Sequence, residues 1–130
     1  HCISSAASDV YKRQALERVC LGSFNSRTIK KINALEPKIL TSMGISQVIM
    51  YKFFWKKTNS RLIQIPTSRY GIKVVTKNFI DRLHEDGYKV HVWTINSESQ
   101  MQMLIDLGVD GIMTDNASGL MNVMRQNKLI

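Results

Sequence analysis

Short runs of β-branched residues alternate with longer stretches of helical period along the chain from Glu17 onward. Strands joined through helices of this length are not hairpins, and parallel neighbours require such a crossover connection. The pattern therefore predicts an α/β fold with a parallel sheet. The predicted strands cover residues 18–24, 39–41, 62–66, 89–95 and 109–114.

Two helices are predicted in the first half of the chain. Ser26 is placed to cap the first helix, and Pro37 ends it, because the residue before a proline avoids helical backbone. A second helix is predicted from about residue 46 to residue 57. The apolar side of the first helix consists of Ile29, Ile32 and Leu35.

Three further helices are predicted in the second half of the chain. Thr76 is placed to cap the first of them, and Gly87 to end it in the left-handed conformation that glycine adopts readily. Ser97 and Gln100 have the spacing of a capping box for the next helix, which ends at Gly108. The last helix carries an apolar stripe of Leu120, Met121, Val123 and Met124.

The first fourteen residues, His1 to Gln14, lack this periodicity and are mostly small or polar. They also resemble the translated adapter sequence found at the broken ends of assembled sequence data. We interpret residues 1–14 as a non-native or disordered leader and residues 15–130 as the domain.

The chain has 130 residues, 44% of them hydrophobic, which is enough for one small domain with a core. It is too short for a complete (β/α)8 barrel, which needs about 250 residues. An open doubly wound sheet and a section of a closed barrel give the same alternation. No Gly-x-Gly-x-x-Gly motif follows a predicted strand, which weighs mildly against a dinucleotide-binding fold.

A formal net charge of +8 suits an anionic partner such as phosphate, nucleic acid or a lipid headgroup. The segment from Tyr51 to Lys57 interleaves lysines with aromatic residues, a pattern that also suits nucleic acid or an anionic membrane surface. The favoured interpretation is an outer helix with its apolar residues on the sheet and its lysines in water.

Nothing in the sequence has the length of a membrane span, and no secretory leader opens the chain. Two cysteines, Cys2 and Cys20, are too few for a disulfide framework and fit a reducing compartment. We therefore expect a cytoplasmic protein without stable membrane insertion.

Two segments near the C-terminal end carry a specific pattern. Val90 to Asn96 reads Val-His-Val-Trp-Thr-Ile-Asn, and Leu107 to Asp115 reads Leu-Gly-Val-Asp-Gly-Ile-Met-Thr-Asp. Together with further segments upstream, and in this order along roughly residues 17–128, these two segments resemble the glycerophosphodiester phosphodiesterase family. Matching upstream segments are Cys20-Leu21-Gly22-Ser23-Phe24, the stretch from Pro37 to Ser42, Gln64-Ile65-Pro66 and Val74-Val75-Thr76.

The resemblance implies a fold and an activity. The family fold is a (β/α)8 TIM-type barrel, so the chain is expected to be its C-terminal half, with parallel strands and outer helices. The family hydrolyses glycerophosphodiesters to glycerol 3-phosphate and an alcohol, so the implied partner is a small molecule and not nucleic acid. Its members use a divalent metal, Ca or Mg, held by carboxylates, and two histidines that act as general acid and base. In the family these groups lie on the first half of the barrel, beginning with a His-Arg-Gly motif.

The motifs of the family's catalytic half do not occur in this sequence. None of the three histidines opens a His-Arg-Gly motif, and no Glu-x-Asp or Glu-x-Glu pair stands at a predicted strand end to hold a hard cation. We therefore expect no catalytic residue and no metal ligand in this chain, and no hydrolysis by the chain alone. The alternative is a non-catalytic basic α/β module that binds nucleic acid or anionic lipid.

Residues near strand ends are the candidates for substrate binding, since barrel enzymes place their sites there. The resemblance implies that Trp93 forms a wall of the substrate pocket, and the alternative for it is a core aromatic residue. Ser23 and Asn96 are expected to bind the ligand or to support its loops. Asp115 is a further candidate, although capping the following helix is slightly favoured for it.

Four other polar residues remain, and three of them have mainly structural interpretations. His91 shares strand parity with Trp93 and is expected to be a satisfied core histidine, whereas His84 is expected on a helix surface. Asp110, at the start of its strand, is expected to be structural. Gln64 is expected to face the barrel mouth.

Overall fold

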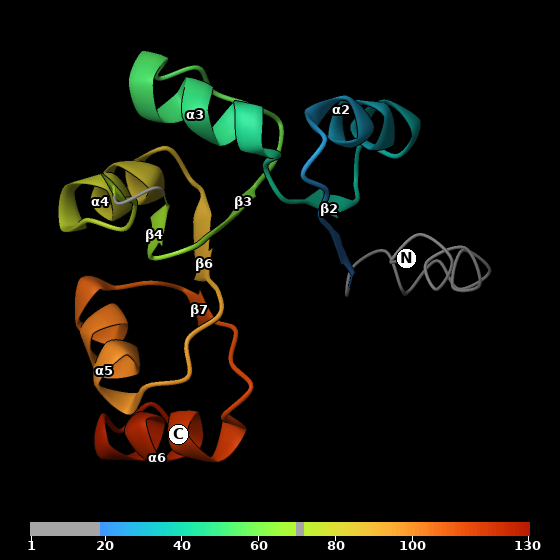
Figure 1. Ribbon diagram of the computed structural model, residues 1–130. Coiled ribbons are helices and arrows are strands. Elements are labelled where there is room, and N and C mark those ends of the chain that lie inside the picture. The colour runs from blue at the N-terminus through green and yellow to red at the C-terminus, as the bar shows by residue number, and fades with distance from the viewer. Residues whose placement is uncertain (1–18, 70–71) are drawn as a thin grey trace. The chain divides into compact units, whose positions relative to one another are not determined.

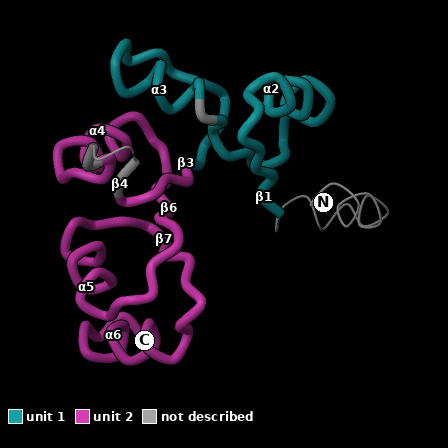
Figure 2. The backbone as a smooth tube through the Cα atoms, in the orientation of Figure 1, with its two compact units in different colours: residues 1–63 teal, residues 64–130 magenta. Residues whose placement is uncertain are grey.

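The computed structural model describes residues 19–69 and 72–130, which form short strands and helices in alternation (Figure 1). The chain divides into two compact units, residues 1–63 and residues 64–130 (Figure 2), and each is described by itself. The predicted leader, residues 1–14, lies outside the described residues.

Unit 1 is built on short parallel strands. Strand β1 (Cys20–Leu21) runs parallel to β2 (Leu40–Thr41), with Cys20 opposite Leu40. Ser42, just after β2, forms a parallel bridge with Leu62. Helix α2 (Ser26–Leu35) makes the crossover between β1 and β2, as predicted for parallel neighbours.

The ends of α2 differ in one respect from the prediction. Asn25, and not Ser26, is the N-cap residue, and its Oδ1 accepts a hydrogen bond from the Arg27 N–H at 2.9 Å. The helix stops before Pro37, as predicted. Ile29 is buried, but Leu35 is 85% exposed, so its predicted place on the buried side is wrong.

Helix α3 (Ile45–Phe54) begins where the chain passes close to α2. A Cβ atom on Gly44, its N-cap residue, would lie 2.5 Å from the Ser26 Oγ atom, so this approach requires glycine. The helix ends at Trp55, which has a positive φ of 53°, and not at residue 57 as predicted. Tyr51 is buried, but Phe53 and Phe54 are exposed, so the prediction that the apolar residues of this segment face the sheet holds only in part.

The described part of unit 2 contains three helices, each preceded by a strand. Strand β3 (Leu62–Ile65) crosses the boundary between the units, and its end lies beside β6 (Lys89–Val92), which pairs in parallel with β7 (Gly111–Ile112). In this pair His91 lies opposite Gly111. The helices of unit 2 are α4 (Lys77–Glu85), α5 (Glu98–Leu107) and α6 (Ala117–Gln126).

The core of unit 2 follows the predicted pattern along α4, but of the stripe predicted for α6 Val123 is buried, whereas Met121 is 42% exposed. Thr76 caps α4 through its side chain, and Phe79, Ile80 and Leu83 are buried along one side of that helix, which packs against β6. On β6, Val90 and Val92 are completely buried. The remaining buried apolar residues of the unit are Ile65, Val75, Tyr88, Ile95, Met101, Leu104 and Val123.

Two local features of unit 2 depart from the sequence predictions. Strands β4 (Ser68–Arg69) and β5 (Ile72–Lys73) form an antiparallel pair that the pattern did not predict, because strands of two residues are too short to show a period. Ser97 is the N-cap of α5, but its Oγ atom lies 2.8 Å from Ser99 Oγ and makes no capping bond. The predicted capping box is therefore wrong.

Candidate functional site

The segments that follow β6 and β7 stay paired beyond the strands themselves. The Met113 N–H donates to the Val92 carbonyl, and the Ile95 N–H donates to the Met113 carbonyl, both at 2.9 Å. Side chains that follow the two strands are therefore held at the same end, the carboxyl end of this parallel pair. In barrel enzymes that end carries the active site.

Asn96 and Asp115 meet at this end, as predicted. The Asn96 Nδ2 donates to Asp115 Oδ2 at 3.2 Å, and its Oδ1 accepts from the Asp115 N–H at 2.9 Å. Thr114 donates from its Oγ1 to the same Asn96 oxygen at 3.2 Å. The amide of Asn96 is thus engaged in holding the loop after β7. We refer to Asn96, Thr114, Asp115 and Asn116 as the strand-end cluster.

Asn116 and not Asp115 caps α6, so the preference for Asp115 as the cap is wrong. The Asn116 Oδ1 accepts from the Gly119 N–H at 3.0 Å and from Ser118 Oγ at 3.1 Å. Thr114 was not predicted as a site residue, and its Oγ1 accepts from the Asn116 N–H at 2.8 Å. The spacing between Asn116 and the apolar stripe that begins at Leu120 is the sequence signal that indicates Asn116 as the N-cap.

Trp93 lies three residues before Asn96 and is half-buried. Its N–H donates to the Ile65 carbonyl at 3.2 Å, and its peptide bond to Thr94 is cis. Ser23 belongs to unit 1, where its Oγ accepts from the Asn25 N–H at 3.1 Å ahead of α2. The grouping of Ser23 with the unit 2 residues, and a pocket-wall role for Trp93, stay predictions.

Asp110 lies at the opposite end of the β6–β7 pair and makes three hydrogen bonds there. Lys89 Nζ, the Val90 N–H and His84 Nε2 each lie 2.8 Å from its carboxylate, which is 18% exposed. Burial raises the pKa of this carboxyl group, but the bonds from Lys89, Val90 and His84 prevail and lower the pKa to about 2. The structural role predicted for Asp110 is supported, and His84 contributes to it.

His91 packs against the backbone of β7. A Cβ atom on Gly111 would lie 2.7 Å from the His91 Cδ2 atom, so the imidazole ring needs a residue without a side chain opposite it. Burial lowers the pKa of His91, and the negative charge of Asp110 opposes this shift. Gln64 is half-buried on β3.

The strand-end cluster does not fit a divalent metal ion. Asp115 supplies its one carboxylate, whereas a hard cation such as Ca²⁺ takes about six to eight oxygen ligands, usually including several carboxylates. Within residues 19–69 and 72–130, no three His, Cys, Asp or Glu side chains lie close enough together to hold a metal.

In the described part of the chain, no helix is long and apolar enough to cross a membrane.

Parallel strands joined by crossover helices, with polar side chains at the strand ends, define an α/β fold with parallel strands, as predicted. The model of the glycerophosphoryl diester phosphodiesterase family matches residues 3–118. The chain belongs to this family, which confirms the resemblance seen in its sequence.

Curated relatives of the chain are named as glycerophosphodiester phosphodiesterases. The chain is 26% identical to a probable glycerophosphodiester phosphodiesterase 2 of Mycobacterium tuberculosis, over 94% of this chain and 50% of the relative. It is 32% identical to a glycerophosphodiester phosphodiesterase of Bacillus altitudinis, over 78% of this chain and 41% of the relative. The chain therefore spans about half the length of these relatives.

Solved structures share the fold at low sequence identity. A glycerophosphodiester phosphodiesterase from Parabacteroides distasonis has a TM-score of 0.74 at 20% identity, covering 96% of this chain and 50% of that structure. A phosphodiesterase from Oleispira antarctica, solved with the product sn-glycerol-3-phosphate, has a TM-score of 0.64 at 20% identity, covering 82% and 41%. These structures confirm the partial barrel.

Proposed function

We propose that this chain is part of a hydrolase that cleaves glycerophosphodiesters to glycerol 3-phosphate and an alcohol, and that it contributes to substrate binding. Family membership supports the reaction. The observation that carries the binding role is the hydrogen-bonded pair of Asn96 and Asp115 at the carboxyl end of β6 and β7. The alternative of a non-catalytic basic module gains no support from the relatives.

The arrangement of Asp115 suits a hydroxyl group better than a phosphate. Asn96 is hydrogen-bonded to the Oδ2 atom and to the N–H of Asp115. The Asp115 side chain is exposed, and its Oδ1 atom is left to accept a hydrogen bond from a ligand. A carboxylate repels a phosphodiester, whereas a glycerol or alcohol hydroxyl donates to it. The glycerol phosphate in the Oleispira antarctica relative supports such a ligand.

Trp93 is the proposed apolar contact for the same ligand. Its indole offers a large flat surface to carbon atoms, and it precedes Asn96 by three residues. Ser23 is proposed as a further polar contact. We propose that the ligands of the divalent cation and the proton-transferring histidines of the whole enzyme lie outside residues 19–69 and 72–130. The chain alone is expected to be inactive.

The decisive experiment replaces Asp115 in the whole protein. Asp115→Asn should raise KM for a glycerophosphodiester roughly tenfold, with a smaller effect on kcat, because it removes a charged hydrogen-bond acceptor. Asp106→Asn is the matched control, since Asp106 also accepts from a side-chain amide, that of Gln102, but lies on α5. Steady-state kinetics of both variants, with Trp93→Ala beside them, measure the effect.

Three outcomes would contradict parts of the proposal. A KM for Asp115→Asn equal to that of the control would remove Asp115 from the ligand site. A kcat that collapses with KM unchanged would move Asp115 from binding to chemistry. Unchanged kcat/KM in Trp93→Ala would return Trp93 to a purely structural role.

A further inference from the structure

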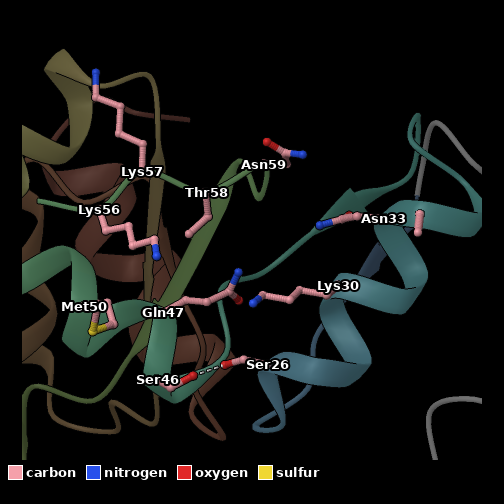
Figure 3. A pocket seen from close by; sticks show the side chains of 11 residues that line it. Ser26, Lys30, Asn33, Ser46, Gln47, Met50, Lys56, Lys57, Thr58 and Asn59 are labelled. Atoms are coloured by element: carbon pink, nitrogen blue, oxygen red, sulfur yellow. Dashed lines mark hydrogen bonds between the residues drawn. The ribbon is translucent and has the colours of Figure 1, made fainter.

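A pocket of about 420 Å³ lies within unit 1, between α2, α3 and the chain that follows α3 (Figure 3). Its polar lining includes Lys30 and Asn33 from α2, Gln47 from α3, and Lys56 and Asn59 from the segment after α3. At one end the hydroxyls of Ser26 and Ser46 are hydrogen-bonded to each other at 2.5 Å. The residues that line the pocket include no carboxylate.

Two lysines of the pocket reach toward Gln47. Lys30 extends from α2 and Lys56 from the segment after α3, whereas the ammonium group of Lys57 points away from the pocket (Figure 3). Two ammonium groups around one pocket repel each other, and an anion between them would relieve that repulsion. The pair therefore favours a negatively charged occupant.

The two amide side chains of the pocket are oriented by bonds to their oxygens. Gln47, which is 9% exposed, accepts the Gly44 N–H at its Oε1 at 2.9 Å. Asn33 accepts the Thr41 hydroxyl at its Oδ1, also at 2.9 Å. Because a donor holds each oxygen, each amide nitrogen is left to donate to an occupant of the pocket. Ammonium and amide donors thus converge without a matching carboxylate.

We propose that this pocket binds a phosphate group. A phosphate oxygen accepts several hydrogen bonds, and Lys is a common phosphate-binding residue. The surrounding charge agrees, since residues 19–63 contain eight Lys and Arg against one acidic residue, Glu36. The volume also leaves room for an organic group attached to the phosphate. The proposal rests on unit 1 and does not depend on the role proposed for Asp115.

The phosphate has two possible sources, a soluble phosphate compound or the headgroup of an anionic lipid. Phe53 and Phe54, at the end of α3, are 66% and 69% exposed and precede Lys56 by two or three residues. Exposed aromatic side chains beside lysines are typical of contact with a lipid surface. The experiment therefore uses one probe for each source.

Binding is measured with the whole protein, using inorganic phosphate in a calorimetric titration and vesicles of phosphatidylglycerol in a sedimentation assay. Lys30→Gln and Lys56→Gln should each weaken phosphate binding roughly tenfold, because each removes a charged donor. Lys31→Gln is the matched control, since it removes the same charge from an exposed residue of α2 that does not line the pocket. Circular dichroism checks that every variant is folded.

Each outcome decides the proposal. Binding of free phosphate that is weakened by the two pocket variants, and not by Lys31→Gln, supports it with a soluble source. Binding to vesicles alone supports it with a lipid source, provided that it is lost in the pocket variants and in Phe53→Ser/Phe54→Ser. Binding of neither probe overturns it. Equal weakening by Lys31→Gln and Lys30→Gln overturns it as well, because that result describes a general basic surface.

Discussion

The two units of the chain differ in charge and in the composition of their cores. Residues 19–63 contain eight basic residues and one acidic residue, whereas residues 64–130 contain seven of each. Among the described residues, twelve buried hydrophobic residues fall in unit 2 and five in unit 1, and the buried polar residues all fall in unit 1: Thr41, Ser42, Gln47 and Ser60. Unit 2 is held mainly by apolar packing, whereas unit 1 also depends on buried hydrogen bonds.

The difference shows how a fold of one kind can use its interior in two ways. In unit 1, Thr41 donates to Asn33 and lies 3.2 Å from the Ser60 hydroxyl, and these bonds orient side chains around the pocket. In unit 2, the buried side of α4 is entirely apolar, and the polar side chains gather at the strand ends. Apolar packing fixes a backbone, whereas buried polar contacts also fix the direction of donors and acceptors.

Truncation of a buried isoleucine in each unit tests this comparison most strongly. Ile80→Ala in unit 2 should lower the free energy of unfolding by about 4 kcal/mol, because it leaves a cavity in an apolar core. Ile29→Ala should cost about 2 kcal/mol, because α2 borders a pocket and its surroundings can relax. Hydrogen exchange of amides within each unit measures the two losses separately. Equal costs would remove the distinction between the cores.

Removal of the Asp110 carboxylate tests the main charged contact of unit 2. Asp110→Asn should lower the free energy of unfolding by about 2 kcal/mol at pH 7, because the folded protein lowers the pKa of this group to about 2. A lowered folded pKa stabilises the protein above the unfolded value of about 4, and this stabilisation is lost as the pH falls toward 2. Denaturation of both proteins between pH 7 and pH 2 should show the difference shrinking.

The control for that prediction is Asp81→Asn. Asp81 pairs with Lys77 one helical turn away on α4, and both side chains are about half exposed. An exposed pair of this kind contributes about 0.5 kcal/mol or less. A loss in Asp110→Asn no larger than in Asp81→Asn would show that the three bonds to Asp110 add nothing to stability.

The two neighbouring residues before α6 should separate into a capping role and a site role. Asn116→Ala should lower the free energy of unfolding by about 1 kcal/mol, because it removes the bond to the Gly119 N–H. Asp115→Ala should change stability by less than about half of that, because Asp115 does not cap the helix. Thermal denaturation followed by circular dichroism measures both, and the reverse order would make Asp115 the stabilising residue.

The elements were predictable where local pattern and burial agree. For α4, the capping threonine, the apolar spacing and Gly87 with its positive φ of 80° all stand in the sequence, and the helix formed as predicted. The meeting of Asn96 with Asp115 was also predictable, because both follow parallel neighbouring strands. In these cases one physical rule determines the outcome.

The remaining features depend on competition between neighbours in space. Ser26 and Asn25 could both cap α2, and the approach of Ser46 to Ser26 accompanies the choice of Asn25. Lys30 and Lys56 lie 26 positions apart, so their convergence on one pocket leaves no local pattern. Such features follow from packing between elements, which the spacing of residues along one element does not contain.

The contact between the His91 ring and Gly111 limits how these two positions can change during evolution. A side chain at position 111 would collide with the ring, so replacement of Gly111 becomes tolerable only after position 91 has become smaller. The order of the two changes therefore matters, and a lineage that keeps histidine is held to glycine. The residue allowed at position 111 is thus tied to a residue on the neighbouring strand, twenty positions earlier.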